Sequence, residues 1–121
     1  MAGVRKQRQD AIRDLVRSER IRTQSDLVAC LAEHGFDVTQ ATISRDIADL
    51  RLEKDASGIY VLPEDYRLRM TVTRSVHETR RAQNQVLLLC DPGSASSVAA
   101  ALDASQTSGV LGSIAGDDTI L

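Results

Sequence analysis

The sequence predicts an α+β protein in two parts: an N-terminal winged helix-turn-helix and a small C-terminal α+β domain. Two observations support this fold class. The first half contains three amphipathic helical segments followed by two short apolar runs around a turn. The second half contains an apolar run of strand length, an alanine-rich helical segment and an apolar end with several glycines. We expect a winged-helix domain over residues 1–64, a linker and first strand over 65–81, and the second domain over 82–121.

Length and charge limit the class of protein further. The chain has 121 residues, so each domain holds about 60, and domains of that size bury only about 60% of their unfolded surface. We therefore expect self-association. The net charge of −2 conceals an asymmetry: residues 1–62 contain ten cations and ten acids, whereas residues 82–121 contain four aspartates and no cation.

Patterns that would indicate an enzyme, a metal site or a membrane protein are missing from the sequence. There is no P-loop, no dinucleotide-binding glycine pattern and no Ser/His/Asp spacing, so we expect neither an enzyme nor a cofactor. Cys30 and Cys90 lie far apart without metal-ligand spacing, and we expect two buried structural thiols. The first residues have no apolar signal-peptide region and no apolar run is long enough to span a membrane, so we expect a cytoplasmic protein.

Two helices are predicted before residue 36. Apolar residues three and four positions apart in a polar run predict a first helix over about residues 5–16. The segment "RTQSDLVACLAEHGF" predicts the second helix. Thr23 and Asp26 resemble a capping box, and Gly35 suits the position just after a helix end.

The third helix, in "DVTQATISRDIADLRLEK", has an unusual solvent face. Thr39 can cap the helix, and Ile43, Ile47 and Leu50 fall on one inward stripe. The other residues of its first half are short hydrogen-bonding side chains and one arginine, whereas an ordinary solvated face is rich in Glu and Lys. Gln reads adenine edges, Arg reads guanine, and Ser or Thr reach bases or phosphates, so this face suits a DNA major groove. The candidate DNA-binding residues are Gln40, Thr42, Ser44 and Arg45.

Two short strands are predicted after the third helix. Leu52 begins the first, "DASG" forms a turn, and residues 59–62 form the second before Pro63. Three helices followed by a hairpin are typical of a winged helix-turn-helix, with an ordinary three-helix interaction module as the alternative. The zero net charge of residues 1–62 counts against DNA binding. The cations are nevertheless grouped at the start of the first helix and around the third: Arg5, Lys6, Arg8, Arg45, Arg51 and Lys54.

The second half predicts a strand, a helix and two further strands. Residues 63–69 are interpreted as a linker, "MTVTRSV" as the start of a strand, and His77 as a solvated side chain. "QVLLLC" predicts a strand, "DPGS" a turn and "SASSVAAALDAS" a helix. "GVLGSIAGDDTIL" predicts a strand, a turn at Gly116–Asp117 and the beginning of another strand.

Asp117 and Asp118 raise the question of a ligand. Neighbouring side chains of a flat strand point to opposite faces, so the two carboxylates can address one ligand only at a turn, or from two chains. They are poor metal ligands without further oxygens nearby, because Ca²⁺ needs 6–8. A guanidinium or ammonium ligand suits them better. A solvated hairpin turn is the alternative.

The sequence resembles the bacterial arginine repressor family over nearly its whole length. "TQATISRDIADLRLEK" is similar to the family's recognition-helix motif, and "GSIAGDDTIL" is similar to its C-terminal motif. The resemblance implies a winged-helix DNA-binding domain and an α+β domain that forms trimers and hexamers. It implies free L-arginine as corepressor and operators of arginine metabolism genes as targets. Carried over, Ser44 and Arg45 contact DNA, whereas Asp103, Asp117 and Asp118 line the arginine site.

Two differences from the family bear on the ligand. Ser96 stands where the family is expected to have a glutamine that helps hold arginine, and family sequences normally continue beyond "GDDTIL". We therefore expect weaker assembly. Two functions follow as hypotheses: an arginine-responsive transcriptional repressor, or a short DNA-binding or assembly-modulating relative that no longer senses arginine.

Overall fold

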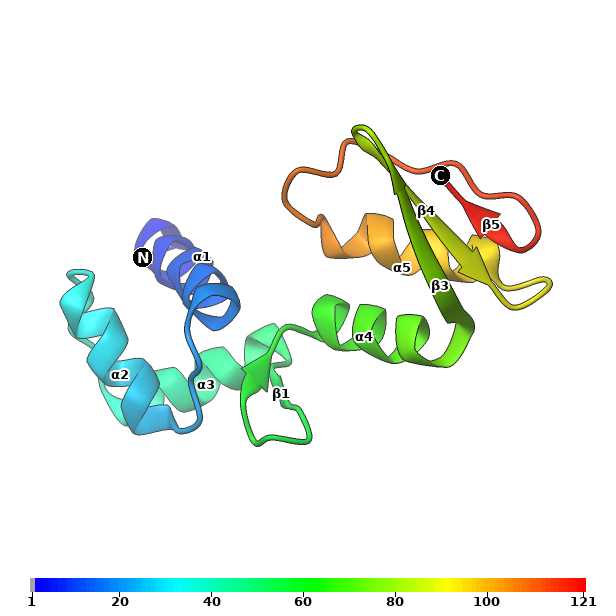
Figure 1. The fold of residues 1–121 in the computed structure, drawn as a ribbon. Helices are drawn as coiled ribbons and strands as arrows, with labels where there is room; N and C mark the ends of the chain where they lie inside the picture. Colours follow the sequence, from blue (N-terminus) through cyan, green and yellow to red (C-terminus); the bar gives the residue numbers. More distant parts are fainter. Residues whose placement is uncertain (1) are drawn as a thin grey trace. The chain divides into compact units, whose positions relative to one another are not determined.

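The computed structural model describes residues 2–121 and divides after Pro63 into two compact units. The first unit contains helices α1 to α3 and the hairpin β1–β2, and the second contains α4, α5 and the strands β3 to β5 (Figure 1). None of the described helices is long and apolar enough to cross a membrane.

The first unit is the predicted winged helix-turn-helix. Its helices are α1 (Ala2–Ser18), α2 (Gln24–Glu33) and α3 (Gln40–Leu50). The strands β1 (Glu53–Lys54) and β2 (Tyr60–Val61) pair antiparallel. The first helix is thus longer at both ends than the apolar spacing predicted. A single apolar core joins the three helices and the hairpin, and its fully buried members are Ile12, Ile21, Leu27, Leu31, Ile43 and Leu62.

The ends of α2 match the predicted capping residues. The Thr23 side chain accepts a hydrogen bond from the Asp26 N–H at 3.0 Å, and the Asp26 carboxylate accepts one from the Thr23 N–H at 3.3 Å. This reciprocal pair satisfies two N–H groups that a helix start leaves free. At the other end Gly35 has φ +86°, and the Phe36 N–H donates to the Leu31 carbonyl at 2.9 Å. That arrangement is a Schellman motif, in which glycine adopts the left-handed backbone without a steric cost.

The hairpin is anchored to the rest of the first unit by polar contacts. Within its turn, the Asp55 carboxylate accepts hydrogen bonds from the Ser57 and Ile59 N–H groups, at 2.8 and 3.1 Å. Outside the turn, the Arg22 guanidinium donates to the Ser57 carbonyl at 2.7 Å. The hairpin therefore has a defined position relative to the α1–α2 connection.

The segment after the hairpin corrects two predictions. Residues 63–69 are helical and not a linker, and "MTVTRSV" is helical up to Ser75, because α4 (Pro63–Ser75) covers both; the strand begins only at its last residue, Val76. Proline suits a first helical position, where its missing N–H is not needed. Acids in the first turn and Arg74 in the last turn also match the helix dipole. The alternating apolar residues that resembled a strand include Val72, which packs on the core of the second unit as a helical residue.

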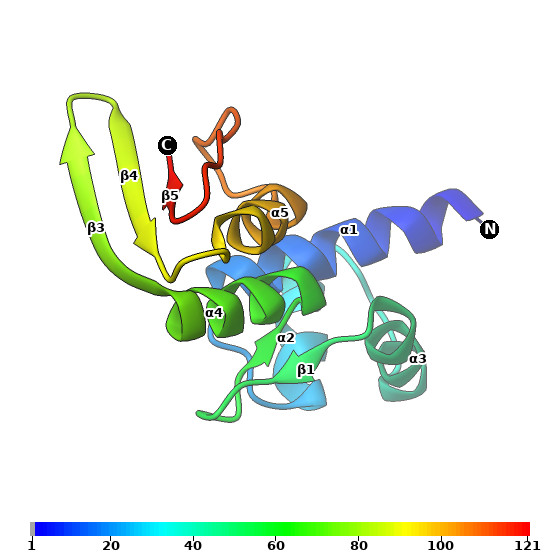
Figure 2. The same cartoon turned by 90° about the vertical axis from the view of Figure 1, so that its right-hand side faces the viewer.

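The second unit is a three-stranded antiparallel sheet covered by α5 (Ala95–Ser105). Its strands are β3 (Val76–Ala82), β4 (Gln85–Cys90) and β5 (Thr119–Ile120), in the order β3-β4-β5. The predictions of a strand at "QVLLLC" and a helix after it are therefore confirmed. Figures 1 and 2 show α5 against one face of this sheet.

Only one face of the sheet has a core beneath it within the unit. Leu88 and Cys90 pack toward Val98 of α5 and Ile120 of β5. Because successive side chains of a strand alternate, Leu87 and Leu89 point to the opposite face, where they are half-buried. The apolar run of β4 is thus covered on one side only.

The last predicted pair of strands forms only in part. Residues 107–118 are irregular apart from a single bridge between Ala115 and Ile120, and β5 follows them as the one strand of residues 107–121. Ile114 and Leu121 exchange two backbone hydrogen bonds, at 3.0 and 2.9 Å. The predicted turn is present, closed by the Gly116 N–H donating to the Thr119 carbonyl at 2.8 Å. Gly109, with φ +84°, and Gly112 interrupt the earlier segment, which explains why no longer strand forms there.

Candidate functional site

The start of α3 is held by threonine hydroxyls. Thr39 is the N-cap: its Oγ1 accepts a hydrogen bond from the Thr42 N–H at 3.2 Å, and its hydroxyl donates to the Thr42 hydroxyl at 3.1 Å. Thr42 is half-buried as a result. Its hydroxyl accepts from Thr39, so its own proton is still available to a partner outside the chain.

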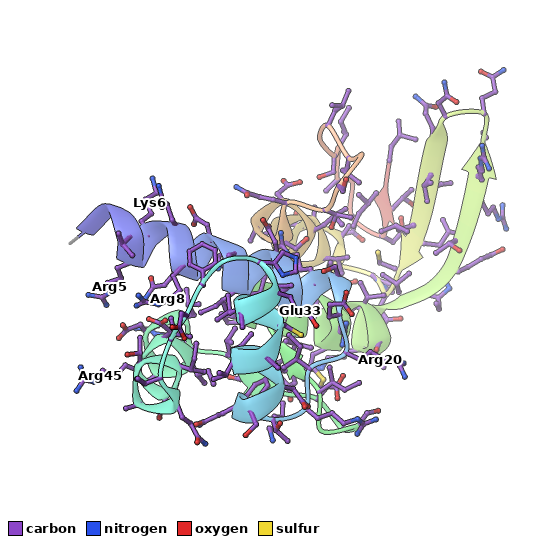
Figure 3. All side chains as sticks on the ribbon, turned by 90° about the vertical axis from the view of Figure 1, so that its left-hand side faces the viewer. Arg5, Lys6, Arg8, Arg20, Glu33 and Arg45 are labelled. Atoms are coloured by element: carbon purple, nitrogen blue, oxygen red, sulfur yellow. The ribbon has the colours of Figure 1, made fainter. Side chains whose placement is uncertain are left out.

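The other predicted DNA-binding residues lie on the solvent face of α3. Gln40, Ser44 and Arg45 are exposed, and within the described part of the chain Arg45 makes no hydrogen bond or ion pair. Figure 3 shows Arg45 extending from α3 away from the other helices. The exposed neighbours of Arg45 on this face are Ala41 and Ala48, one turn before and after it. Their small side chains allow the helix to approach a groove closely.

Asp46, directly after Arg45, is a residue that the sequence analysis did not single out. Its side chain is 1% exposed and accepts hydrogen bonds from both Nε and Nη2 of Arg8, the second at 2.9 Å. Gln9 Nε2 donates to the same carboxylate at 3.1 Å. Two sequence signals were available: Asp46 lies three residues after Ile43 on the inward stripe, and Arg8 lies four residues before the buried Ile12.

Arg8 and Asp46 each stabilise the charged form of the other. Burial alone would raise the pKa of Asp46, but hydrogen bonds from Arg8 and Gln9 and the nearby guanidinium charges outweigh it, and the pKa is lowered. The hydrogen bond to Asp46 raises the pKa of Arg8 in turn. Farther out, Arg5 forms an exposed ion pair with Asp49.

The three cations at the start of α1 differ in their partners. Arg5 and Arg8 extend from α1 toward α3, where each meets an aspartate, whereas Lys6 points away (Figure 3). Both arginines therefore contact α3 within the unit, but only the Arg8–Asp46 pair is shielded from solvent. In the hairpin, the Lys54 ammonium lies 4.9 Å from the centroid of the Tyr60 ring.

Asp117 and Asp118 lie together in the turn before β5, where both are exposed. The Asp117 carboxylate accepts a hydrogen bond from the Gly93 N–H at 3.3 Å, and Asp118 accepts one from the Thr119 hydroxyl at 3.1 Å. Their main chain is fixed as well, because the Asp118 carbonyl accepts from the Cys90 N–H at 2.7 Å and the Asp117 carbonyl from the Ala95 N–H at 3.2 Å. A turn is the arrangement in which adjacent carboxylates can face one ligand.

Asp103 lies elsewhere on the second unit. It is on α5, eight residues beyond Ala95, which corresponds to about 12 Å along a helix axis. Its carboxylate accepts a hydrogen bond from the Ser113 hydroxyl at 3.0 Å, at the edge of an open pocket of about 450 Å³. Asp117 and Asp118 do not line that pocket. A single chain therefore brings two of the three predicted ligand-binding acids together, and the third is separate.

Among residues 2–121, no three His, Cys, Asp or Glu side chains are grouped as metal ligands. Both cysteines are free thiols: Cys90 is buried as expected, but Cys30 is only partly buried. Burial, followed by the charges of nearby acids, raises the pKa of both thiols.

A winged helix-turn-helix whose third helix has an exposed polar face, followed by a separate α+β unit with a cluster of acids, defines a DNA-binding transcriptional regulator. Comparison with known proteins identifies the family. Residues 4–68 match the arginine repressor DNA-binding domain, and residues 72–121 match the arginine repressor C-terminal domain. The chain belongs to the arginine repressor family.

Individual relatives agree with this assignment. A protein of Solibacter usitatus named arginine repressor is 44% identical over 117 residues, which cover 94% of this chain and 81% of that protein. Arginine repressors of Carboxydothermus hydrogenoformans and Bacillus velezensis are 42% and 39% identical, covering 94% and 95% of this chain and 83% and 84% of their own lengths. The predictions of the fold class and of an arginine-responsive transcriptional repressor are therefore confirmed.

Proposed function

We propose that this protein acts in the cytoplasm, binds operator DNA of arginine metabolism genes through α3, and uses L-arginine as its corepressor. The observation that carries the proposal is the solvent face of α3. Arg45 is exposed and unpartnered among the described residues, on a helix whose start is capped and whose inner face is fixed by a core and a buried ion pair. A rigid helix with a free guanidinium suits bidentate reading of guanine in a major groove.

The four polar residues of α3 have distinct roles in this proposal. Arg45 reads a base edge, and Ser44 contacts an adjacent phosphate or base. Gln40 lies one turn before Ser44 on the same face, where it can reach adenine. Thr42, whose hydroxyl already accepts from Thr39, donates its remaining proton to a phosphate.

The arginine site is proposed to be shared between subunits. Asp117 and Asp118 would bind a cationic group of L-arginine from one chain, and Asp103 of a neighbouring chain would reach the same ligand. Asp103 lies about 12 Å along α5 from Ala95, the residue that meets the Asp117 carbonyl, and this separation supports sharing because one chain does not bring all three acids together. Carboxylates match the planar donors of a guanidinium well. A bound cation would also relieve the repulsion among clustered acids, so arginine would strengthen assembly.

Assembly as a trimer or hexamer is proposed for the second unit. The face of the sheet that carries Leu87 and Leu89 has no cover within the unit. Several large apolar side chains of the same unit are exposed as well: Met70, Val86, Val110, Leu111, Ile114 and Leu121. A second copy of the chain would bury this surface, and joined subunits would bind several DNA half-sites at once.

The DNA part is tested with Arg45→Ala. Duplexes are first selected from random sequence by the wild-type protein in the presence of L-arginine. The substitution should weaken binding to the selected duplex by about 1–3 kcal/mol while the far-UV circular dichroism is unchanged. Arg20→Ala, an exposed arginine that lies across the unit from Arg45 in Figure 3, removes the same charge and is the control. Equal affinities of wild type and Arg45→Ala at all salt concentrations would exclude α3 as the reader.

The ligand part is tested by calorimetry with L-arginine and by sedimentation. Asp118→Asn removes one charge with little change in shape and should weaken arginine binding by about 1–3 kcal/mol. Asp10→Asn, on the exposed surface of α1, makes the same charge change away from the site. If the wild type shows no heat, no mass shift and no gain in DNA affinity at millimolar arginine, the relative that no longer senses arginine is the correct alternative.

A further inference from the structure

The polar contacts between α1 and α3 form one connected cluster beneath the reader helix. Asp46 and Asp49 lie one turn apart on α3, and on α1 the neighbours Arg8 and Gln9 lie one turn after Arg5. Gln9 connects the two ion pairs, since its amide donates to Asp46 at 3.1 Å and to Asp49 at 3.5 Å. The inner pair is buried, with Asp46 1% and Arg8 14% exposed, whereas the outer pair is open to solvent.

Stability alone is a weak reason for a buried ion pair. Apolar side chains of similar volume often stabilise a core as well as such a pair or better, because both charges must be removed from water. The ion pair adds a constraint on the orientation of α3. Apolar contacts such as those of Ile43 and Ile47 are roughly proportional to buried area, and a small rotation of α3 changes them little. A guanidinium that binds a carboxylate through two N–H groups tolerates only a narrow range of angles.

We propose, given that α3 reads DNA as proposed above, that the Arg8–Asp46 pair positions α3 by setting its rotation about the helix axis. This rotation directs the Arg45 guanidinium toward the DNA base that it reads. Asp46 is the next residue along the helix from Arg45, so fixing one fixes the direction of the other. A helix with its side chains has a radius of about 5–6 Å, so a rotation of about 10° moves a side-chain tip by about 1 Å. Hydrogen bonds to a base edge require donor–acceptor distances of about 2.7–3.2 Å. A displacement of that size therefore removes specific base contacts. Contacts between flexible Lys or Arg side chains and DNA phosphates are less affected.

The test uses a double variant that removes the charges but preserves packing. Arg8→Met with Asp46→Leu places an apolar side chain at each position, unbranched at 8 and branched at 46, and leaves no unpaired charge. Its affinity is compared with that of the full-length wild type for two duplexes: one selected from random sequence by the wild type with L-arginine, and a scrambled duplex of the same composition. Each is measured at several salt concentrations, and urea unfolding is followed in parallel. Arg20→Met, at an exposed arginine across the unit from Arg45, shows how the loss of an arginine far from α3 affects the salt slope.

The expected result is a separation of stability from specificity. The double variant should unfold near the wild-type midpoint and keep the wild-type salt dependence, while its preference for the selected over the scrambled duplex falls about tenfold or more. An unchanged preference in a folded double variant would overturn the proposal. A salt slope lowered by about one would also overturn it, because Arg8 would then contact a phosphate directly.

A second variant covers the case in which the double variant does not fold. Arg8→Lys keeps the charge but cannot bind Asp46 through a planar fork, so it should retain the salt slope and lose part of the preference. Full preference in Arg8→Lys would contradict the proposal. If the wild type selects no sequence at all, the proposed DNA-reading function itself fails, and that outcome is distinct from the two above.

Discussion

Removal of the Asp46 carboxylate should destabilise the first unit far more than removal of Asp49, one turn along the same helix. Asp46→Ala leaves Arg8, whose side chain is 14% exposed, without its partner, and breaks the hydrogen bond from Gln9. Breaking a buried ion pair in this way costs about 3–5 kcal/mol. Domains are stable by only about 5–15 kcal/mol, so the loss is a large fraction of the total.

Asp49→Ala is the matched control. It is the same substitution on the same helix, and it breaks an ion pair with the same neighbouring helix, but Asp49 is 43% exposed and its partner Arg5 is 59% exposed. Exposed pairs contribute about 0–1 kcal/mol because water and salt screen them. Urea unfolding followed by far-UV circular dichroism suits the comparison, since the chain contains no tryptophan. Equal losses in the two variants would refute the assignment of Asp46 as a buried partner.

The same comparison at several pH values has a definite sign. The pKa of Asp46 is lowered in the folded state, so the folded protein binds this proton less readily than the unfolded chain. Its stabilisation is therefore fully present above the unfolded pKa of about 3.9 and is lost as the pH falls through the lower folded value. The difference between the wild type and Asp46→Ala should stay constant from neutral pH to about pH 5 and shrink below about pH 4. A difference that grows on acidification would contradict this reasoning.

Three further predictions concern other parts of the chain. Thr39→Ala should cost about 1 kcal/mol in urea unfolding through loss of the α3 cap, whereas Thr39→Ser should retain most of the stability, and equal losses would argue against the hydroxyl cap. Gly35→Ala should cost about 1–2 kcal/mol from its left-handed backbone alone, since no atom lies within 4 Å of the added methyl group; an unchanged unfolding midpoint would contradict the φ of +86°. Leu89→Lys should lower the sedimentation mass without loss of helix signal, because it places a charge on the uncovered sheet face; an unchanged mass would locate the subunit contacts on another surface.

The features predicted correctly from sequence are those that depend on neighbours in the chain. The caps Thr23 and Thr39 and the glycine after α2 were predicted because each acts on residues within about one helical turn. The strand β4 was predicted from a continuous apolar run. α4 was missed because Pro63 ends one element and begins the next, and a proline alone does not distinguish a linker from a first helical turn.

Pairings between distant residues could not be predicted in the same way. Arg8 and Asp46 are 38 positions apart, and only the packing of α1 against α3 brings them together. From the sequence, Arg8 was therefore grouped with Arg5 and Lys6 at the start of the first helix, and its pairing with Asp46 was not predicted. The separation of Asp103 from Asp117 likewise depends on which end of α5 meets the final turn, and the sequence contains no local signal for that.

The way in which the final turn is held has a consequence for how ligand recognition can change over evolution. The main chain of residues 117 and 118 is tied to Cys90 and Ala95 by backbone hydrogen bonds, which do not depend on the identity of either side chain. Both side chains point into solvent within the unit, so substitutions there disturb no core. In the arginine site proposed above, position and chemistry would thus be encoded separately: the backbone would fix where the ligand is met, and the side chains of residues 117 and 118 would decide which ligand binds there. A regulator built in this way can acquire a new effector through one or two substitutions while its fold stays intact.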